Sequence, residues 1–158
     1  MAFTNNPHRL DGKIDLHYYT EADSQSFKAG QIVYLAAGAV GGQVTVVADA
    51  GTLGMGIAMA DATNVTSDNA TIPVDVLAPG DYIRIRCNTG AADTLSNTLY
   101  PGKSYGLVSV SNVTYLDSDN TTNDVFVFIE PEYSADGDAT YWAIAQVKST
   151  AAQGTTGS

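Results

Sequence analysis

Few residues in this sequence carry side chains that enzymes use for nucleophilic or acid–base chemistry. It has two histidines, His8 and His17, and one cysteine, Cys87. A Ser-His-Asp or Cys-His arrangement needs an imidazole beside a nucleophile. His17 alternates with Asp15 and Tyr19, as in a strand with one solvent-exposed side, so we expect an exposed imidazole there. These residues predict no catalytic centre.

Acidic residues gather in two places. Glu130 and Glu132 flank Pro131, where the pattern predicts the end of a strand and a turn instead of an acid–base pair. Residues 117–124 offer hard oxygen ligands suited to calcium, namely Asp117, Asp119, Thr121, Asn123 and Asp124. Thr122 stands where an EF-hand loop needs glycine, and strands flank the segment. We therefore predict a solvated hairpin loop, no metal site and no cofactor.

The stretch "LGMGIAMADA", residues 53–62, has two glycines at the spacing of a phosphate-binding loop. A dinucleotide fingerprint also needs a third glycine before a helix, and here that position is Met59. The residues that follow lack helical periodicity. We expect a strand in which Gly54 and Gly56 leave a thin face, so that other backbone approaches closely.

The elements that must position these residues are strands, because apolar side chains recur with period two. Cys87 shares one face with Ile83 and Ile85, which predicts a small core residue and leaves Arg84 and Arg86 on the other face. Turn signals rich in Gly, Pro and Asp separate the strands. The pattern predicts an all-β, single-domain β-sandwich or barrel-like fold. Its eight alternating segments are residues 13–19, 31–36, 43–48, 71–77, 81–87, 106–116, 124–130 and 141–147.

Composition narrows the function classes. The 158 residues include 7 basic and 17 acidic ones, a formal charge of −10 that repels a phosphate backbone, so we expect no nucleic-acid partner. No apolar stretch approaches the ~20 residues that cross a bilayer, and no basic start precedes an apolar run. We expect synthesis in a cytoplasm and no membrane partner. One cysteine permits no internal disulfide.

Three parts of the chain differ in pattern. Residues 1–13 are polar and we predict an extended N-terminal arm; residues 14–148 form the β-rich core domain; residues 149–158 are small and polar and form a C-terminal tail.

Three motifs occur in order within residues 27–86. They are Lys-Ala-Gly at residues 28–30, Gly-Ile-Ala-x-x-Asp-Ala at residues 56–62 and Pro-Gly-Asp at residues 79–81. In this order the stretch resembles the capsid decoration, or cement, proteins of tailed bacteriophages. The match spans a little over a third of the chain, and its motifs are structural. Residues 99–133 fit no pattern shared with that family, so a different β-rich virion protein is an alternative.

The resemblance implies a non-enzymatic structural protein on the outer capsid surface of a virion. Its partners would be the major capsid protein and two further copies in a homotrimer, with the N-terminal arm lying on the shell. The expected capsid contacts combine apolar anchors with one positive charge: Phe3, Pro7, Arg9 and Leu10. We expect deletion of residues 2–12 to leave the β-core folded and to abolish capsid binding.

A second interpretation is a carbohydrate-binding or receptor-binding β-sandwich on a phage spike, fibre or tail. Nine tyrosines and Trp142 favour it, because sugars stack on exposed aromatic rings. Trp142 alternates with Ile144, however, which is typical of a core or a subunit interface, and the aromatic residues are scattered.

Overall fold

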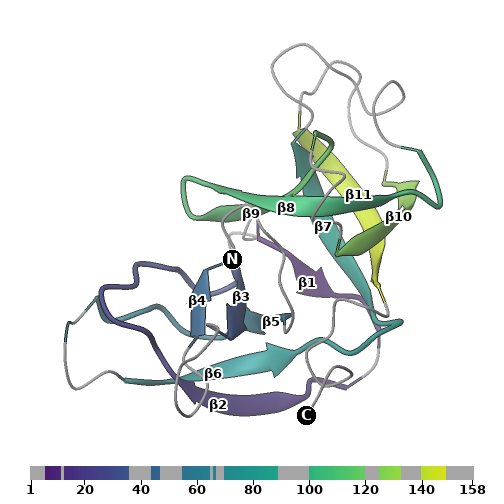
Figure 1. Cartoon of the computed structure of the whole chain (residues 1–158). Coiled ribbons are helices and arrows are strands. Elements are labelled where there is room, and N and C mark those ends of the chain that lie inside the picture. The colour runs from purple at the N-terminus through teal and green to yellow at the C-terminus, as the bar shows by residue number, and fades with distance from the viewer. Residues whose placement is uncertain are drawn as a thin grey trace.

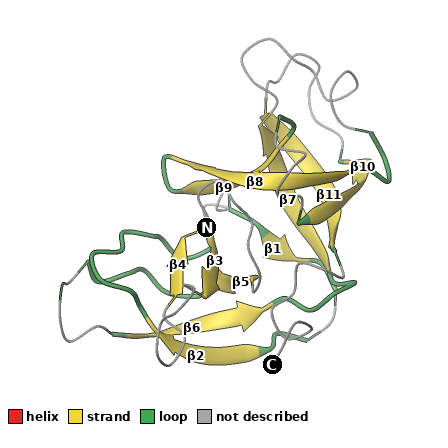
Figure 2. Cartoon of the chain, in the orientation of Figure 1, coloured by secondary structure: helices red, strands yellow, loops and turns green. Residues whose placement is uncertain are grey.

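The strands of the part of the chain that the structure describes form two β-sheets (Figure 1). The computed structural model describes residues 6–11, 13–35, 44–46, 55–64, 66, 70–88, 100–119, 125–132 and 140–148. Within these ranges there are strands and no helix (Figure 2). The predicted all-β fold is confirmed.

The first sheet has five strands. Its order is β2 (Leu16–Thr20), β6 (Thr71–Val76), β5 (Met55–Ala58), β3 (Ile32–Leu35) and β4 (Val44–Val46). All neighbours in it are antiparallel. We call it the five-stranded sheet.

The second sheet closes on itself. Its order is β1 (His8–Arg9), β7 (Tyr82–Asn88), β11 (Thr140–Val147), β10 (Phe126–Pro131), β8 (Ser104–Val110) and β9 (Val113–Asp117). A parallel pairing of β9 with the end of β7 closes five strands, β7, β11, β10, β8 and β9, into a barrel. Strand β1 pairs with the start of β7. Closure leaves no free edge among these five strands.

Alternating side chains fill the barrel. Ile83, Ile85 and Cys87 of β7 are completely buried, and Arg84 and Arg86 lie on the outer face, as the sequence predicted. Burial raises the pKa of the Cys87 thiol above its ordinary value, as expected for a core residue.

The main hydrophobic core extends from the barrel to the five-stranded sheet. Phe126 and Leu107 of the barrel belong to the same cluster as Ile32 and Ile57 of the sheet. A second cluster, which includes Phe27, lies on the other face of that sheet. Because one core spans both sheets, the barrel and the sheet pack as one unit.

The alternating segment at residues 106–116 is a hairpin, not a single strand. Strands β8 and β9 pair antiparallel, with Val110 opposite Val113. Ser111 and Asn112 between them have positive φ angles of 50° and 64°. Positive φ at both central residues is the geometry of a type I′ turn, which Asn tolerates well.

Strand β5 lies unusually close to its neighbour β6 at Gly56. A Cβ added to Gly56 would lie 2.3 Å from Cγ1 of Val74 and 2.9 Å from the carbonyl oxygen of Asp75. The close approach expected from "LGMGIAMADA" is present, and its partner is the neighbouring strand β6. Gly54 lies outside the described residues.

Candidate functional site

Residues 6–11, which we call the N-terminal segment, pack against the folded body. Pro7 is buried, and the Arg9 side chain is only 8% exposed. These residues belong to the predicted N-terminal arm, and here they pair with the barrel sheet, because β1 lies antiparallel to the start of β7. Of the expected capsid contacts, Leu10 is exposed and Phe3 lies outside the described residues.

Arg9 holds the N-terminal segment to two other parts of the chain. Its guanidinium makes a bidentate contact with Asp75 of β6, at 2.7 and 3.0 Å, and donates to Asp81 at 2.6 Å. It also donates to the carbonyl oxygen of Val76 at 2.9 Å. The hydrogen bonds with Asp75 raise the pKa of Arg9 further above its ordinary value. Arg9 is therefore a fixed internal cation.

Asn6 and Gln31 add neutral contacts across the same boundary. The Asn6 side chain accepts from the Thr114 N–H at 3.0 Å and donates to the Asn112 carbonyl at 3.0 Å. Gln31 donates to the Ser109 hydroxyl at 2.6 Å. We call the boundary between the barrel and the five-stranded sheet the junction; its polar residues are Asn6, Arg9, Gln31, Asp75, Asp81 and Thr114.

The three motifs that carry the family resemblance meet around the junction. The first two bind each other, because Asp61 accepts from the Ala29 N–H at 2.9 Å and from Lys28 at 3.1 Å. These donors, the N–H first, lower the pKa of Asp61. Gly30 of the first motif lies against Asn6, and Asp81 of the third binds Arg9. The first and third motifs thus contact the N-terminal segment, and the second motif holds the first.

A cavity of about 440 Å³ opens between the N-terminal segment and the five-stranded sheet. We call it the groove. Residues Pro7 to Asp11 and Ile14 form one side, and Ala29, Gly30, Asp75 and residues 57–59 form the other. In Figure 1, the strand β1 lies above β5 and β6.

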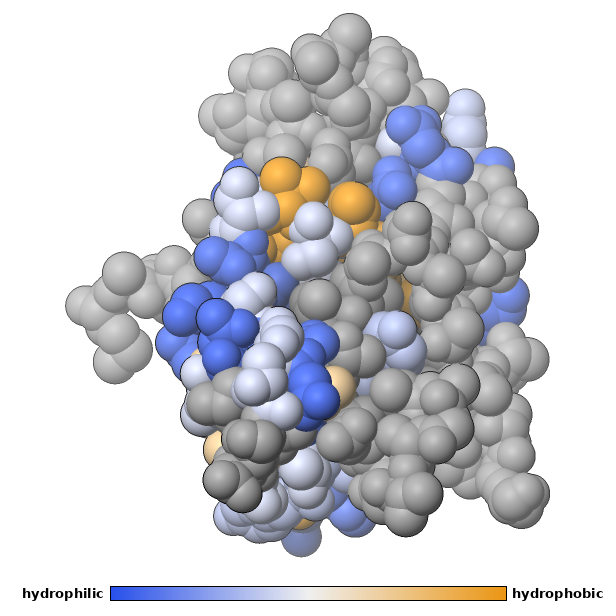
Figure 3. All heavy atoms as spheres, turned by 60° about the vertical axis from the view of Figure 1, so that its left-hand side comes forward, coloured by the Kyte–Doolittle hydropathy of each residue, from blue (hydrophilic) through white to orange (hydrophobic). Residues whose placement is uncertain are grey.

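Exposed apolar side chains gather near this groove. Figure 3 shows one face of the molecule, on which most of the coloured residues are hydrophilic. The described chain exposes seven large hydrophobic side chains, and three of them, Leu10, Ile14 and Met59, line the groove. Two further exposed hydrophobic side chains, Leu16 and Tyr18 of β2, follow Ile14 closely in the sequence.

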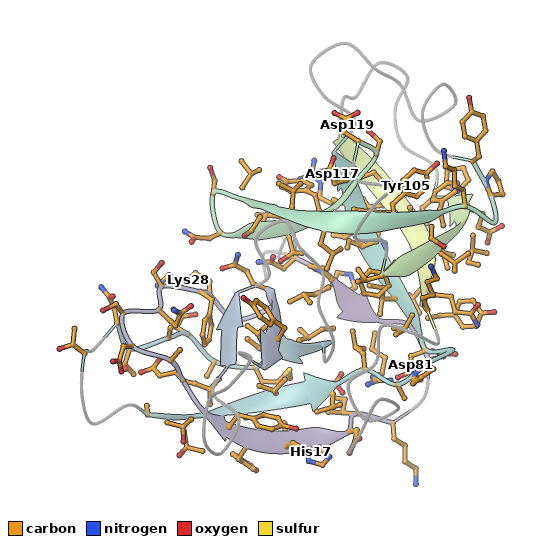
Figure 4. All side chains as sticks on the ribbon, viewed as in Figure 1. His17, Lys28, Asp81, Tyr105, Asp117 and Asp119 are labelled. Atoms are coloured by element: carbon orange, nitrogen blue, oxygen red, sulfur yellow. The ribbon has the colours of Figure 1, made fainter. Side chains whose placement is uncertain are left out.

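The other residues considered for chemistry lie apart from the groove. His17 is exposed and contacts Asp15 at 3.0 Å, as predicted for a solvent-side imidazole. Figure 4 places Asp117 and Asp119 at the barrel end, far from His17 on β2. Burial raises the pKa of Asp117. Thr121, Asn123 and Asp124 of the acidic segment lie outside the described residues.

Glu132 is committed to an ion pair with Arg84. Glu130 is exposed, at the end of β10. The predicted strand end at Pro131 is confirmed. Within the described ranges, no group of three or more His, Cys, Asp or Glu side chains is placed to hold a metal ion. No helix there is long and apolar enough to cross a membrane.

Trp142 lies on the outer face of the barrel, half-buried, while its neighbours Ala143 and Ala145 face the core. The Arg84 guanidinium is 4.2 Å from the centre of the indole ring, and the His8 ring is 5.3 Å away. Arginine over an aromatic face is a favourable cation–π contact. These neighbours cover ring surface on which a sugar would stack.

Two buried carboxylates were missed by the sequence reasoning. Asp75 lies in strand β6 between Val74, which is buried, and Val76, which is half-buried. The alternation of apolar and polar residues predicts an exposed side chain at this position, so the sequence did not indicate a buried carboxylate. Glu21 is fully buried and accepts hydrogen bonds from the backbone and hydroxyl of Thr63 and from the Ala70 N–H. Their partners are distant in sequence, which no local pattern reveals.

Comparisons with known protein families, with characterised proteins and with solved structures found no match to this chain.

Proposed function

We propose that this chain is a non-enzymatic virion structural protein that binds the outer surface of a phage capsid and stabilises the shell. The observation that carries the proposal is that the three motifs resembling decoration proteins make structural contacts with one another or with the N-terminal segment. Lys28 and Ala29 bind Asp61, and Asp81 binds Arg9. The motifs serve to fix backbone geometry, which is what a clamp on a lattice requires.

Charge and architecture support the same role. A formal charge of −10 is compatible with an outer surface, away from packaged nucleic acid. A closed barrel that shares its core with a second sheet is a rigid body, and rigidity lowers the entropic cost of binding. The proposed partners are the major capsid protein and, by the family resemblance, two further copies in a homotrimer.

The four expected capsid contacts divide into two groups. Pro7 is buried and Arg9 is held by Asp75 and Asp81, and both line the groove. Leu10 is exposed and Phe3 is still a predicted contact.

The carbohydrate-binding interpretation receives less support. Arg84 and His8 lie against Trp142, so they cover part of the indole surface on which a sugar would stack. Retention of the purified protein on a polysaccharide column would favour that interpretation over capsid binding.

Co-sedimentation with shells that lack this protein tests the proposal. Purified protein should pellet with such shells to a saturating ratio and should raise the temperature at which they rupture. A Leu10→Ser variant, which changes an exposed side chain, tests the contact assignment. Deletion of residues 2–12 is unsuitable, because it removes Arg9 and leaves the buried Asp75 without its cation. A wild-type protein that stays in the supernatant would refute the proposed function.

A further inference from the structure

The groove continues along the face of the five-stranded sheet toward its edge. Leu16 lies directly opposite Asp75 in the register of β2 and β6, and Asp75 lies opposite Ile57 of β5. Directly opposite residues in a sheet point to the same face. Leu16 therefore stands on the side of the sheet where Asp75 and Ile57 line the groove.

The exposed members of this surface alternate along the chain. Ile14, Leu16 and Tyr18 are 60%, 44% and 65% exposed. Leu16 and Tyr18 share one face of β2, and Ile14 precedes the strand and lines the groove. Tyr18 lies opposite Pro73, which is half-buried. Five of the seven exposed large hydrophobic side chains in the described chain thus belong to the groove or to its extension along β2.

Strand β2 also has a free edge among the described strands. It is the first strand of the five-stranded sheet and pairs with β6 alone. The other side of such a strand presents backbone N–H and C=O groups that can pair with an added strand. Recognition by strand addition takes affinity from main-chain hydrogen bonds and specificity from pockets for alternate side chains. A free edge beside an apolar groove provides both.

The charge around this surface selects the occupant. Two carboxylates, Asp11 and Asp75, line the groove together with one arginine, Arg9. Two more carboxylates adjoin it, because the backbone of Asp15 binds Asp75 and Asp81 binds Arg9. A second copy would bring the same formal charge of −10 to this acidic surface and is disfavoured as its occupant, so the contacts of the proposed homotrimer would lie elsewhere. A partner segment with lysine or arginine beside its apolar residues would be attracted.

The groove is built before any partner arrives. Arg9 fixes one wall through Asp75 and Asp81, and the backbone N–H of Asp15 donates to Asp75 at 2.9 Å. Walls held by buried ion pairs lose little freedom on binding, which preserves affinity.

We propose that the groove and the edge of β2 dock an extended segment of another protein, with apolar side chains at alternate positions and lysine or arginine among the others. The segment pairs with β2, its apolar side chains pack on Leu16 and Tyr18, and one fills the cavity beside Ile14 and Met59. This inference goes beyond the proposed function, because it concerns the docking site and the chemistry of its ligand and holds whether or not the partner is a shell protein.

Selection from a library of random linear peptides displayed on yeast tests the proposal with the purified full-length protein. The peptides enriched should carry alternate apolar residues and net positive charge, and their binding should weaken as salt is raised. Ile14→Ser and Met59→Ser should each weaken the enriched peptides by about tenfold. Val110→Ser is the matched control, because Val110 and Met59 are 44% and 45% exposed and Val110 lies on the β8–β9 hairpin.

Three results would overturn the proposal. One is the absence of any enriched peptide, and another is enriched peptides that bind both groove variants as tightly as they bind the wild type. The third is self-association in sedimentation equilibrium that Met59→Ser abolishes, since the occupant would then be a second copy. If the wild type co-sediments with shells while the peptide selection fails, the inference is overturned and the proposed function stands. If peptides dock in the groove but shells are not bound, the inference stands and the proposed function is refuted.

Discussion

The barrel core and the Arg9–Asp75 pair of the junction are both largely buried, but their side chains have opposite chemistry. The barrel is filled by apolar residues such as Ile85, Leu107 and Phe126, each completely buried. The junction is held by Arg9 and Asp75, whose side chains are 8% and 4% exposed. The first region therefore depends on buried area and the second on paired charges.

This difference teaches where the molecule tolerates change. Apolar packing is non-directional, so a core loses stability roughly in proportion to the volume removed. A buried ion pair adds little net stability, but removal of one partner leaves a charge without compensation. Substitutions in the barrel core should therefore lower stability according to the side-chain volume that they remove. Substitutions in the junction should lower stability when they remove one member of an ion pair.

Removal of the Phe126 side chain should have the largest effect. Phe126→Ala deletes a ring from the centre of the shared core and should lower the free energy of unfolding by about 3–5 kcal/mol. Chemical denaturation measures the change, with Val110→Ala on the exposed hairpin as the control. A loss no greater than that of the control would contradict the account of the barrel core.

Removal of Arg9 should come next. Arg9→Leu leaves Asp75 buried without its cation and should cost about 3 kcal/mol. The double variant Arg9→Leu/Asp75→Leu should recover part of this loss, because no unpaired charge remains at position 75. If the single variant lay within about 0.5 kcal/mol of the wild type, the pair would behave as a surface salt bridge and the comparison would fail.

A methyl group at Gly30 should disturb the contact between the N-terminal segment and the first motif. The added Cβ would lie 2.7 Å from Cβ of Asn6, and the residue has a φ of +96°. Gly30→Ala should therefore cost about 2 kcal/mol. Gly102→Ala is the matched control, since its φ is +86° and nothing lies within 4 Å of the added atom. Equal losses in both variants would mean that backbone strain, and not the Asn6 contact, accounts for the effect.

The smallest effect should be a pH dependence that comes from His8. Burial, and then the nearby charge of Arg84, lower the pKa of this imidazole in the folded protein. The unfolded chain, with a pKa of about 6.5, takes up the proton first as the pH falls. The contribution of His8 to stability is thus complete above the unfolded pKa and is lost as the pH falls toward the folded pKa.

His8→Phe keeps an aromatic ring beside Trp142 and removes the titrating group. Denaturation at pH 7 and pH 5 should therefore show a smaller drop in stability for this variant than for the wild type. An unchanged drop would show that other groups cause the dependence.

The barrel and the junction also differ in how far the sequence predicts them. The alternation of Ile83, Ile85 and Cys87 lies within one strand, so a local pattern was enough to place β7 and its buried face. The all-β fold followed from several such segments. The hairpin between β8 and β9 was not separated into two strands, because Ser111 and Asn112 form a turn without glycine or proline.

The junction was out of reach of local reasoning. Arg9 is 66 positions from Asp75 and 72 from Asp81 along the chain, so no spacing rule connects them. A polar N-terminus normally indicates a loose end, and long-range pairing with β7 overrides that expectation here. The groove depends on the place of the N-terminal segment and was equally unpredictable.

The most direct test of the proposed function is the amount of this protein in native particles. Particles from the source lysate are purified on a density gradient, and the protein is quantified relative to the major shell protein in the same band. The account predicts co-migration at a fixed, high ratio to the shell protein, because only a shell lattice offers so many equivalent sites. A few copies per particle would indicate a spike, fibre or tail component, and absence from particles would contradict the account.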